Sequence, residues 1–167
     1  MRKLIKNSDI VKKCKELGNE ITKQFQGKEV IVVCVLKGAT PFFAELIKHI
    51  NLEMLTDFIQ VKSYQGTQST GNITLKKDLD YNITNKDVII VEDIIDTGNT
   101  LSWLKQELSK RNPTSLTFVT LLDKPSRRKV EFKPDYIGFT IEDLFVYGFG
   151  LDLDEKYRNL KDIYVND

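Results

Sequence analysis

VIIVEDIIDTGNTL, residues 88–101, joins an apolar run to a helix-like pattern through an acidic loop that contains a glycine. The continuous apolar run is typical of a strand that is covered on both faces of a parallel sheet. It brings Glu92 and Asp93 to the carboxyl end of that strand, and Asp96-Thr97-Gly98-Asn99-Thr100 then opens a helix. Open α/β sheets bind ligands at this edge, so the stretch predicts both the fold and the place of a site.

Strand and helix patterns alternate on both sides of this unit. Apolar residues recur every three or four positions from Ile10 to Phe25, which predicts an amphipathic helix capped by Ser8 or a neighbour. Thr40 followed by Pro41 predicts the start of a second helix. Strands are expected at 29–36, 54–63, 73–77, 115–122 and 135–140. The alternation indicates an α/β domain with a mainly parallel central sheet.

The bulk properties restrict the class of protein. The chain has 167 residues, the size of one domain, with 25 Lys plus Arg against 24 Asp plus Glu. This balance gives no sign of a nucleic-acid tail or a membrane-binding surface. Cys14 and Cys34 are expected to be buried apolar residues, and His49 has no partner for a zinc site. With no signal-peptide pattern and no apolar stretch of roughly 20 residues, we expect a cytoplasmic location.

The acidic loop has a chemistry of its own. Small hydroxyl residues and glycine at a helix N-terminus present backbone N–H groups to a phosphate. Carboxylates beside a phosphate are useful if the ligand also carries ribose hydroxyls and a divalent cation. Residues 92–100 therefore indicate a phosphorylated sugar. The alternative is a helix capped by Asp96 or Thr97, with Glu92 and Asp93 merely solvated.

Five segments, in one order, resemble the purine phosphoribosyltransferases, and closely the hypoxanthine-guanine group. They are VLKGATPFFAEL, KSYQGTQSTG, VEDIIDTGNTL, LLDKPSRR and FVYGFGLDLDEKYRNL. The resemblance covers most of the chain. It implies the type I phosphoribosyltransferase fold, in which a mainly parallel sheet flanked by helices lies beneath a small hood. We expect one domain, residues 1–167, with the hood mainly from about 125–167.

The resemblance assigns the acidic loop to ribose 5-phosphate. Asp96, Thr97, Gly98, Asn99 and Thr100 would hold the phosphate, and Glu92 and Asp93 would contact the ribose hydroxyls. Asp96 would also be the catalytic acid/base near purine N7. Pyrophosphate would meet the loop Leu36-Lys37-Gly38, whose lysine amide follows a non-proline cis peptide in this family, together with Arg128 and Arg158. Without the resemblance, Lys37-Gly38 would pass as an ordinary turn.

The purine and the metal involve later segments. By resemblance Lys124 donates to the 6-oxo group, Phe145 stacks on the purine, and the backbone of Val146 reads its edge. Asp152 is assigned to the purine site and also to magnesium on the pyrophosphate side, and Glu92 and Asp93 are the other candidate metal ligands. Ser63-Tyr64 opens a polar lid. On the residues themselves, Lys124 could be a surface lysine and Phe145 a core residue.

These assignments predict a purine-salvage enzyme. It would transfer the phosphoribosyl group from phosphoribosyl pyrophosphate to a 6-oxopurine, with Mg²⁺ as cofactor, in a homo-oligomer (dimer or tetramer). No nucleic-acid or membrane partner is expected. The alternatives are a regulatory nucleotide-binding protein and an enzyme for xanthine or a pyrimidine. Two residues depart from the family pattern: Asn99 replaces a common basic residue, and Leu144 gives no polar help in separating hypoxanthine from guanine.

Overall fold

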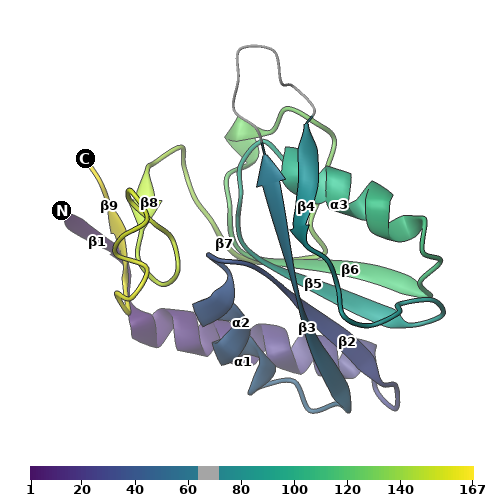
Figure 1. Ribbon diagram of the computed structural model, residues 1–167. Coiled ribbons are helices and arrows are strands. Elements are labelled where there is room, and N and C mark those ends of the chain that lie inside the picture. Colours follow the sequence, from purple (N-terminus) through teal and green to yellow (C-terminus); the bar gives the residue numbers. More distant parts are fainter. Residues whose placement is uncertain (64–71) are drawn as a thin grey trace.

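The computed structural model describes residues 1–63 and 72–167. Its centre is a six-stranded sheet in the order β4-β3-β2-β5-β6-β7 (Figure 1). The strands are β2 (Val30–Val35), β3 (Met54–Ser63), β4 (Ile73–Lys77), β5 (Asp87–Ile95), β6 (Ser115–Asp123) and β7 (Tyr136–Thr140). All neighbours run parallel except the pair β3 and β4. The predicted α/β class is therefore confirmed.

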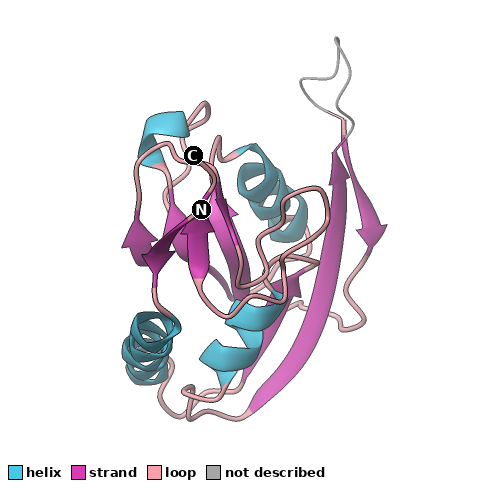
Figure 2. Ribbon diagram, turned by 90° about the vertical axis from the view of Figure 1, so that its left-hand side faces the viewer, coloured by secondary structure: helices cyan, strands magenta, loops and turns pink. Residues whose placement is uncertain are grey.

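Helices cover both faces of this sheet (Figure 2). Helices α1 (Asn7–Gln24) and α2 (Thr40–Ile47) share one core with alternate residues of β2, such as Val32 and Cys34. The other β2 residues, such as Val33, pack with α3 (Asn99–Ser109) in a second core. A strand buried on both faces explains why its sequence is continuously apolar. The layers leave the carboxyl ends of the strands free for a site.

A small second sheet holds both ends of the chain, in the order β1-β9-β8 (Figure 1). Its strands are β1 (Arg2–Ile5), β8 (Val146–Tyr147) and β9 (Ile163–Val165). The N-terminal strand β1 pairs with β9, and β8 and β9 come from the segment expected to supply most of the hood, residues 125–167. In addition, β7 pairs with the main sheet. Strands of two to four residues are too short to show an alternating pattern in the sequence.

The starts of the two N-terminal helices agree with the sequence prediction to within two residues. Lys6, and not Ser8, is the N-cap of α1, and it makes no side-chain cap bond. The Asn7 N–H instead donates to the carboxylate of Asp162 at 2.7 Å, a partner 155 positions away in sequence. Helix α2 begins at Thr40 with Ala39 as the N-cap. Both cysteines are buried and free, as predicted. No helix in the described part of the chain is long and apolar enough to cross a membrane.

Candidate active site

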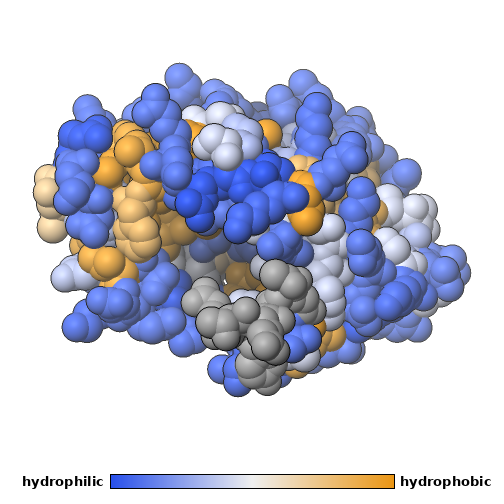
Figure 3. All heavy atoms as spheres, turned by 90° about the horizontal axis from the view of Figure 1, so that it is seen from above, coloured by the Kyte–Doolittle hydropathy of each residue, from blue (hydrophilic) through white to orange (hydrophobic). Residues whose placement is uncertain are grey.

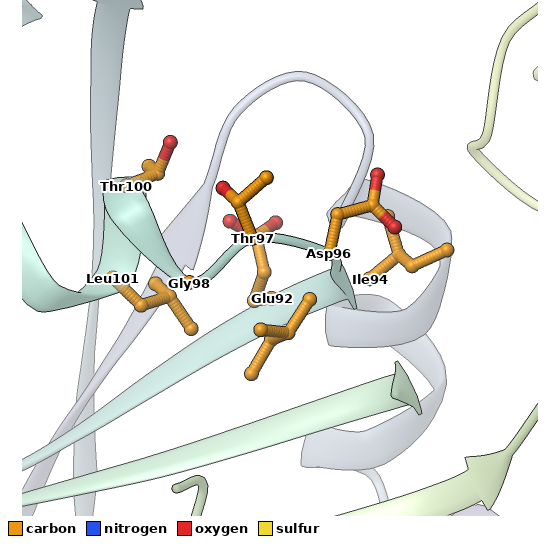
Figure 4. Close-up of a pocket in the computed structure, with 8 residues that line it drawn as sticks. Glu92, Ile94, Asp96, Thr97, Gly98, Thr100 and Leu101 are labelled. Atoms are coloured by element: carbon orange, nitrogen blue, oxygen red, sulfur yellow. The ribbon is translucent and has the colours of Figure 1, made fainter. Parts of the chain in front are cut away.

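The acidic loop lies where strand β5 passes into helix α3 (Figure 4). Strand β5 continues to Ile95, three residues beyond the predicted end at residue 92. Gly98 is the N-cap of α3 and has a left-handed φ of 85°, a conformation that glycine adopts without steric cost. The N-cap Gly98 has no side chain, but Thr97 Oγ1 accepts from the N–H of Asn99, the first residue of α3, at 3.2 Å. The capping part of the alternative interpretation therefore holds for Thr97, whereas a merely solvated Glu92 does not, because Glu92 is 9% exposed.

A pocket opens over this loop, with a volume of about 230 Å³. In Figure 4 the Thr97 and Thr100 side chains lie on the side of the loop away from the strand. Most of the residues that we predicted for ribose 5-phosphate line this pocket; they are Glu92, Asp96, Thr97, Gly98 and Thr100. The pocket is at the positive end of the α3 dipole, which favours an anion.

Glu92, which lines the pocket, and Asp93 beside it form a pair of carboxylates. The Asp93 N–H donates to Glu92 Oε1 at 2.9 Å, and the Ile94 N–H donates to Asp93 Oδ1 at 2.6 Å. Burial, helped by the charge of Asp93, raises the pKa of Glu92 well above its usual value. Burial also raises the pKa of Asp93, although backbone donors and Arg158 oppose the rise. Glu92 is buried and Asp93 is half-buried, so this pair of acids needs hydroxyl donors or a cation beside it.

Asp96 and Lys124 meet across the carboxyl ends of β5 and β6. Lys124 is only 7% exposed, which rules out the simple surface lysine of the alternative interpretation. Its Nζ lies 3.7 Å from Asp96 Oδ1. That oxygen is buried and has no hydrogen-bond partner within residues 1–63 and 72–167. A buried acceptor without a partner is costly, so this position suits a ligand that brings a donor.

The loop that follows β2 reaches the site from the other side. The peptide bond between Leu36 and Lys37 is cis, as the resemblance predicted. Gly38 packs so tightly that an added Cβ would lie 1.9 Å from Asp93 Oδ2. At Gly150 an added Cβ would lie 2.0 Å from the Gly38 carbonyl oxygen. Only glycine fits such contacts, so residues 36–38, Asp93 and the turn at 150 belong to one assembly.

Basic and acidic side chains form ion pairs beside residues 36–38 and the turn at 150. Arg158 donates to the Gly150 carbonyl at 2.8 Å and to Glu155 Oε2 at 3.1 Å. Lys37 Nζ lies 3.4 Å from the same Glu155 oxygen. Asp152 Oδ2 accepts from the Glu155 N–H at 2.9 Å and lies 3.8 Å from Arg158. Glu155 was not among the predicted site residues, although its spacing of three residues from Arg158 was an available signal.

Arg128 is placed differently from the other basic residues. One of its nitrogens donates to the Asp96 carbonyl at 2.8 Å, and the other contacts Asp123 Oδ1 at 2.5 Å. It thus lies against the acidic loop. Asp123 is 4% exposed, and no pattern in the sequence marked it as the partner of Arg128.

The residues that we predicted for the base pocket, Phe145 and Val146, lie in the segment after β7. Phe145 is 53% exposed, whereas Val146 beside it is 6% exposed and starts β8. The alternative of Phe145 as a core residue is therefore wrong. Seen from above, apolar residues gather on the side of the small sheet, and the rest of that face is mostly hydrophilic (Figure 3). Ser63 ends β3, and Tyr64, its predicted partner in the lid, lies outside the described residues.

Three comparisons with known proteins agree. Residues 2–155 match the family described as the phosphoribosyl transferase domain. The chain is 52% identical to a hypoxanthine-guanine phosphoribosyltransferase of Lactococcus lactis over 158 residues, which are 94% of this chain and 86% of that protein. A crystal structure of such an enzyme from Bacillus anthracis superposes with a TM-score of 0.96 at 47% identity, covering 100% and 99% of the two chains. The Trypanosoma cruzi hypoxanthine enzyme, in complex with its product IMP, gives 0.93 at 36% identity, covering 98% and 92%.

Proposed function

The chain belongs to the phosphoribosyltransferase family, and on that premise we propose how its own residues do the chemistry. The enzyme transfers the 5-phosphoribosyl group from phosphoribosyl pyrophosphate to hypoxanthine or guanine. The products are IMP or GMP and pyrophosphate, so the reaction serves purine salvage. The observation that carries the proposal is the meeting of Asp96, with its unpartnered buried oxygen, and Lys124 above a phosphate-type loop.

The 5-phosphate binds residues 96–100 in this proposal. Their pocket lies at the N-terminus of α3, where backbone N–H groups and the helix dipole attract an anion. Asn99 contributes its backbone and no positive charge. The ribose hydroxyls donate to Glu92 and Asp93, which relieves the cost of burying two acids side by side.

The pyrophosphate lies on the opposite side, at Leu36-Lys37-Gly38 and Arg158. Gly38 brings backbone close to Asp93, and Arg158 spans from Gly150 to Glu155. A guanidinium suits phosphate oxygens because its donors form a planar fork. Arg128 was predicted for the same role, but its guanidinium lies against the Asp96 carbonyl of the acidic loop.

Magnesium fits the donor set of this site. In the described ranges no three His, Cys, Asp or Glu side chains gather into a metal cage. Mg²⁺ often takes only one or two protein carboxylates and completes its shell with substrate oxygens and water. Glu92, Asp93 and Asp152 are the candidate ligands, and Asp152 lies beside Arg158 on the pyrophosphate side. When bound, the ion neutralises charge on the leaving pyrophosphate.

In the proposed reaction, purine N9 attacks C1 of the ribose as the bond from C1 to pyrophosphate breaks. Asp96 takes the proton that the purine loses at N7, and the nearby acids favour the positive charge that develops on the ribose. Lys124 donates to the 6-oxo oxygen, and an adenine amino group there would face an ammonium. Phe145 stacks on the ring while the Val146 backbone reads its edge. A lid that starts at Ser63-Tyr64 would exclude water.

The proposal extends to the whole molecule. The chain acts as one domain, residues 1–167, in which the small sheet with residues 145–160 forms the hood. It works in the cytoplasm as a dimer or tetramer, as the family resemblance implies, with small molecules and no nucleic acid or membrane as partners.

An absorbance assay tests this function. Purified protein, Mg²⁺ and phosphoribosyl pyrophosphate are offered hypoxanthine, guanine, xanthine, adenine and uracil separately. Turnover of hypoxanthine or guanine that stops when a chelator removes the metal is the expected result. Turnover with uracil only, or with adenine, would contradict the role of Lys124. Nucleotide binding without turnover of any base would favour the regulatory protein.

A further inference from the structure

Arg128 packs against the acidic loop and donates a hydrogen bond to its backbone. Its guanidinium joins the Asp96 carbonyl, at 2.8 Å, to the Asp123 carboxylate, at 2.5 Å. Its side chain is 16% exposed and that of Asp123 is 6% exposed. The stem packs against Gly98, where an added Cβ would lie 3.0 Å from Arg128 Cδ. One side chain thus contacts both ends of the turn from Asp96 to Gly98.

The backbone around Arg128 is tied to the same turn. The N–H groups of Lys129 and Val130 both donate to the Thr97 carbonyl, at 2.9 and 3.3 Å. The Lys124 N–H donates to the Ile95 carbonyl at 2.9 Å. Phe132 and Val130 pack against Gly98 from below. Residues 124–132 therefore support the acidic loop through several contacts. The guanidinium of Arg128 contacts the loop backbone at the Asp96 carbonyl.

The pair of Arg128 and Asp123 is largely buried, so neither charge is readily released. Removing one partner of a buried ion pair leaves the other uncompensated, which is strongly unfavourable. A guanidinium that left Asp123 to follow a ligand would incur this cost and would free the Asp96 carbonyl as well. The contacts favour an arginine that stays in place through the reaction.

We propose that Arg128, held by Asp123, is a positioning residue that fixes the carbonyl of Asp96 and thereby shapes the 5-phosphate loop. This inference rests on the proposed function, because it assigns that loop to the 5-phosphate. It differs from a direct contact between Arg128 and pyrophosphate. The two roles predict opposite patterns of ligand binding: a positioning residue affects a nucleoside 5′-monophosphate, and a pyrophosphate contact affects pyrophosphate.

Calorimetry on Arg128→Gln with IMP and, separately, with pyrophosphate and Mg²⁺ tests this difference. Positioning predicts that IMP binds roughly tenfold more weakly or worse, since a charge-assisted hydrogen bond is lost. Pyrophosphate affinity should stay within about twofold. Arg127→Gln is the matched control, because Arg127 is a neighbouring arginine whose ion pair within residues 1–63 and 72–167 is with exposed Asp143, at 3.5 Å. IMP affinity that is unchanged in Arg128→Gln, or a loss confined to pyrophosphate, overturns the proposal.

Substitution of Asp123 provides an independent test of the same proposal. Asp123→Asn should weaken IMP binding as Arg128→Gln does, and the double variant should be no worse than Arg128→Gln, because both act through one contact. Wild-type affinity for IMP in Asp123→Asn, or additive losses, would overturn the link. If either variant unfolds readily, the pair Asp123→Leu with Arg128→Met restores an apolar fit. This double variant should fold and still bind IMP weakly; normal binding would reduce the ion pair to a stability role.

Wild-type turnover of a 6-oxopurine is measured first and separates the two proposals. Without turnover of any base the proposed function fails. With turnover, the variants decide the role of Arg128.

Discussion

At the scale of single residues, the site is defined by polar groups that the fold leaves incomplete. Asp96 Oδ1 is buried without a hydrogen-bond partner among the described residues, and the nearest cation, Lys124 Nζ, is 3.7 Å away. An acid in this situation can take a proton, and the ammonium beside it can meet the oxygen of the same purine. In the proposed complex the pair would contact N7 and the 6-oxo oxygen, which lie on the same edge of the purine.

Asp96→Asn tests the proton transfer. Asparagine has almost the same shape but cannot act as a general base, so kcat should fall by roughly 10²- to 10⁴-fold while KM for both substrates changes little. Steady-state kinetics measure both constants. Asp143→Asn, an exposed acid outside the site, is the control. An unchanged kcat would remove Asp96 from the proton transfer.

Phe145→Ala tests base stacking. The ring is 53% exposed in the absence of ligand, so its removal should leave the Tm nearly unchanged. Stacking on a base is worth about 1–3 kcal/mol, and KM for hypoxanthine or guanine should rise by roughly 5- to 150-fold. KM for phosphoribosyl pyrophosphate should stay the same. Equal increases in both KM values would mean that Phe145 supports the whole site and does not stack on the purine.

At the scale of elements, the turn at residues 152–158 holds the carboxylate of Glu155 beside two basic side chains. Glu155 accepts from Arg158 at 3.1 Å and lies 3.4 Å from Lys37 Nζ, the two cations that the proposal gives to pyrophosphate. Both ion pairs are exposed, so each is weak and can be exchanged. A ligand that binds the cations must compete with this carboxylate.

Glu155→Gln should therefore lower KM for phosphoribosyl pyrophosphate, by about two- to fivefold, which is the size expected for exposed ion pairs. Initial rates at varied substrate measure it. Glu107→Gln, which removes a comparable exposed pair with Lys110 on α3, should have no effect. A higher KM in Glu155→Gln would show that the carboxylate orients Arg158 and Lys37 and does not compete.

The link between the small sheet and α1 depends on one carboxylate. Asp162, just before β9, accepts from the Asn7 N–H at the start of α1, and Lys3 Nζ of β1 lies 3.1 Å away. These contacts lower the pKa of Asp162. An acid with a lowered pKa in the folded state stabilises that state above its unfolded pKa, near 3.9. The stabilisation is lost as the pH falls through the lower, folded value.

Asp162→Asn should lower the Tm at pH 7, because a charged partner of a helix N-terminus and of Lys3 is lost. The difference from the wild type should shrink as the pH falls below about 4, where the wild-type acid is protonated too. Calorimetric scans between pH 7 and pH 3 measure it. Asp167→Asn is the control, since the contact that Asp167 makes in the described part of the chain is an exposed one, 3.8 Å from Arg2. A difference in Tm that does not change with pH would exclude the ionic contribution.

Some features of the fold could be predicted from the sequence and others could not. The main strands and all three α-helices follow from apolar patterns and local residue types, because those signals are contained within one element. Distant partners leave no such signal: Asp162 at the start of α1, Asp123 on Arg128, and β1 beside β9 all depend on tertiary pairing. Likewise, no local pattern shows that Lys124 is buried, since proline and charged residues surround it in the sequence. The resemblance supplied the identities of the site residues, and the contacts supply their arrangement.

At the scale of the whole molecule, the sheet separates two cores. Cys14 of α1 and Cys34 of β2 both belong to the core that α1 and α2 cover. Burial raises the pKa of each thiol to about 12. Thiolate is the reactive form, so both residues should be inert in the native state. The rate at which these thiols react therefore reports on the opening of that core.

Labelling with a thiol reagent, followed by mass spectrometry to assign the modified cysteine, measures how fast each thiol becomes accessible. Cys14 and Cys34 should react together and only as fast as the molecule opens, because the same layers cover both. Mg²⁺ with phosphoribosyl pyrophosphate at a hundred times its Kd should slow both reactions roughly a hundredfold, since the ligand binds only the folded state. If Cys14 reacts faster than Cys34 and ignores the ligand, α1 opens alone. Helix α1 would then be a unit separate from the strands that carry the site.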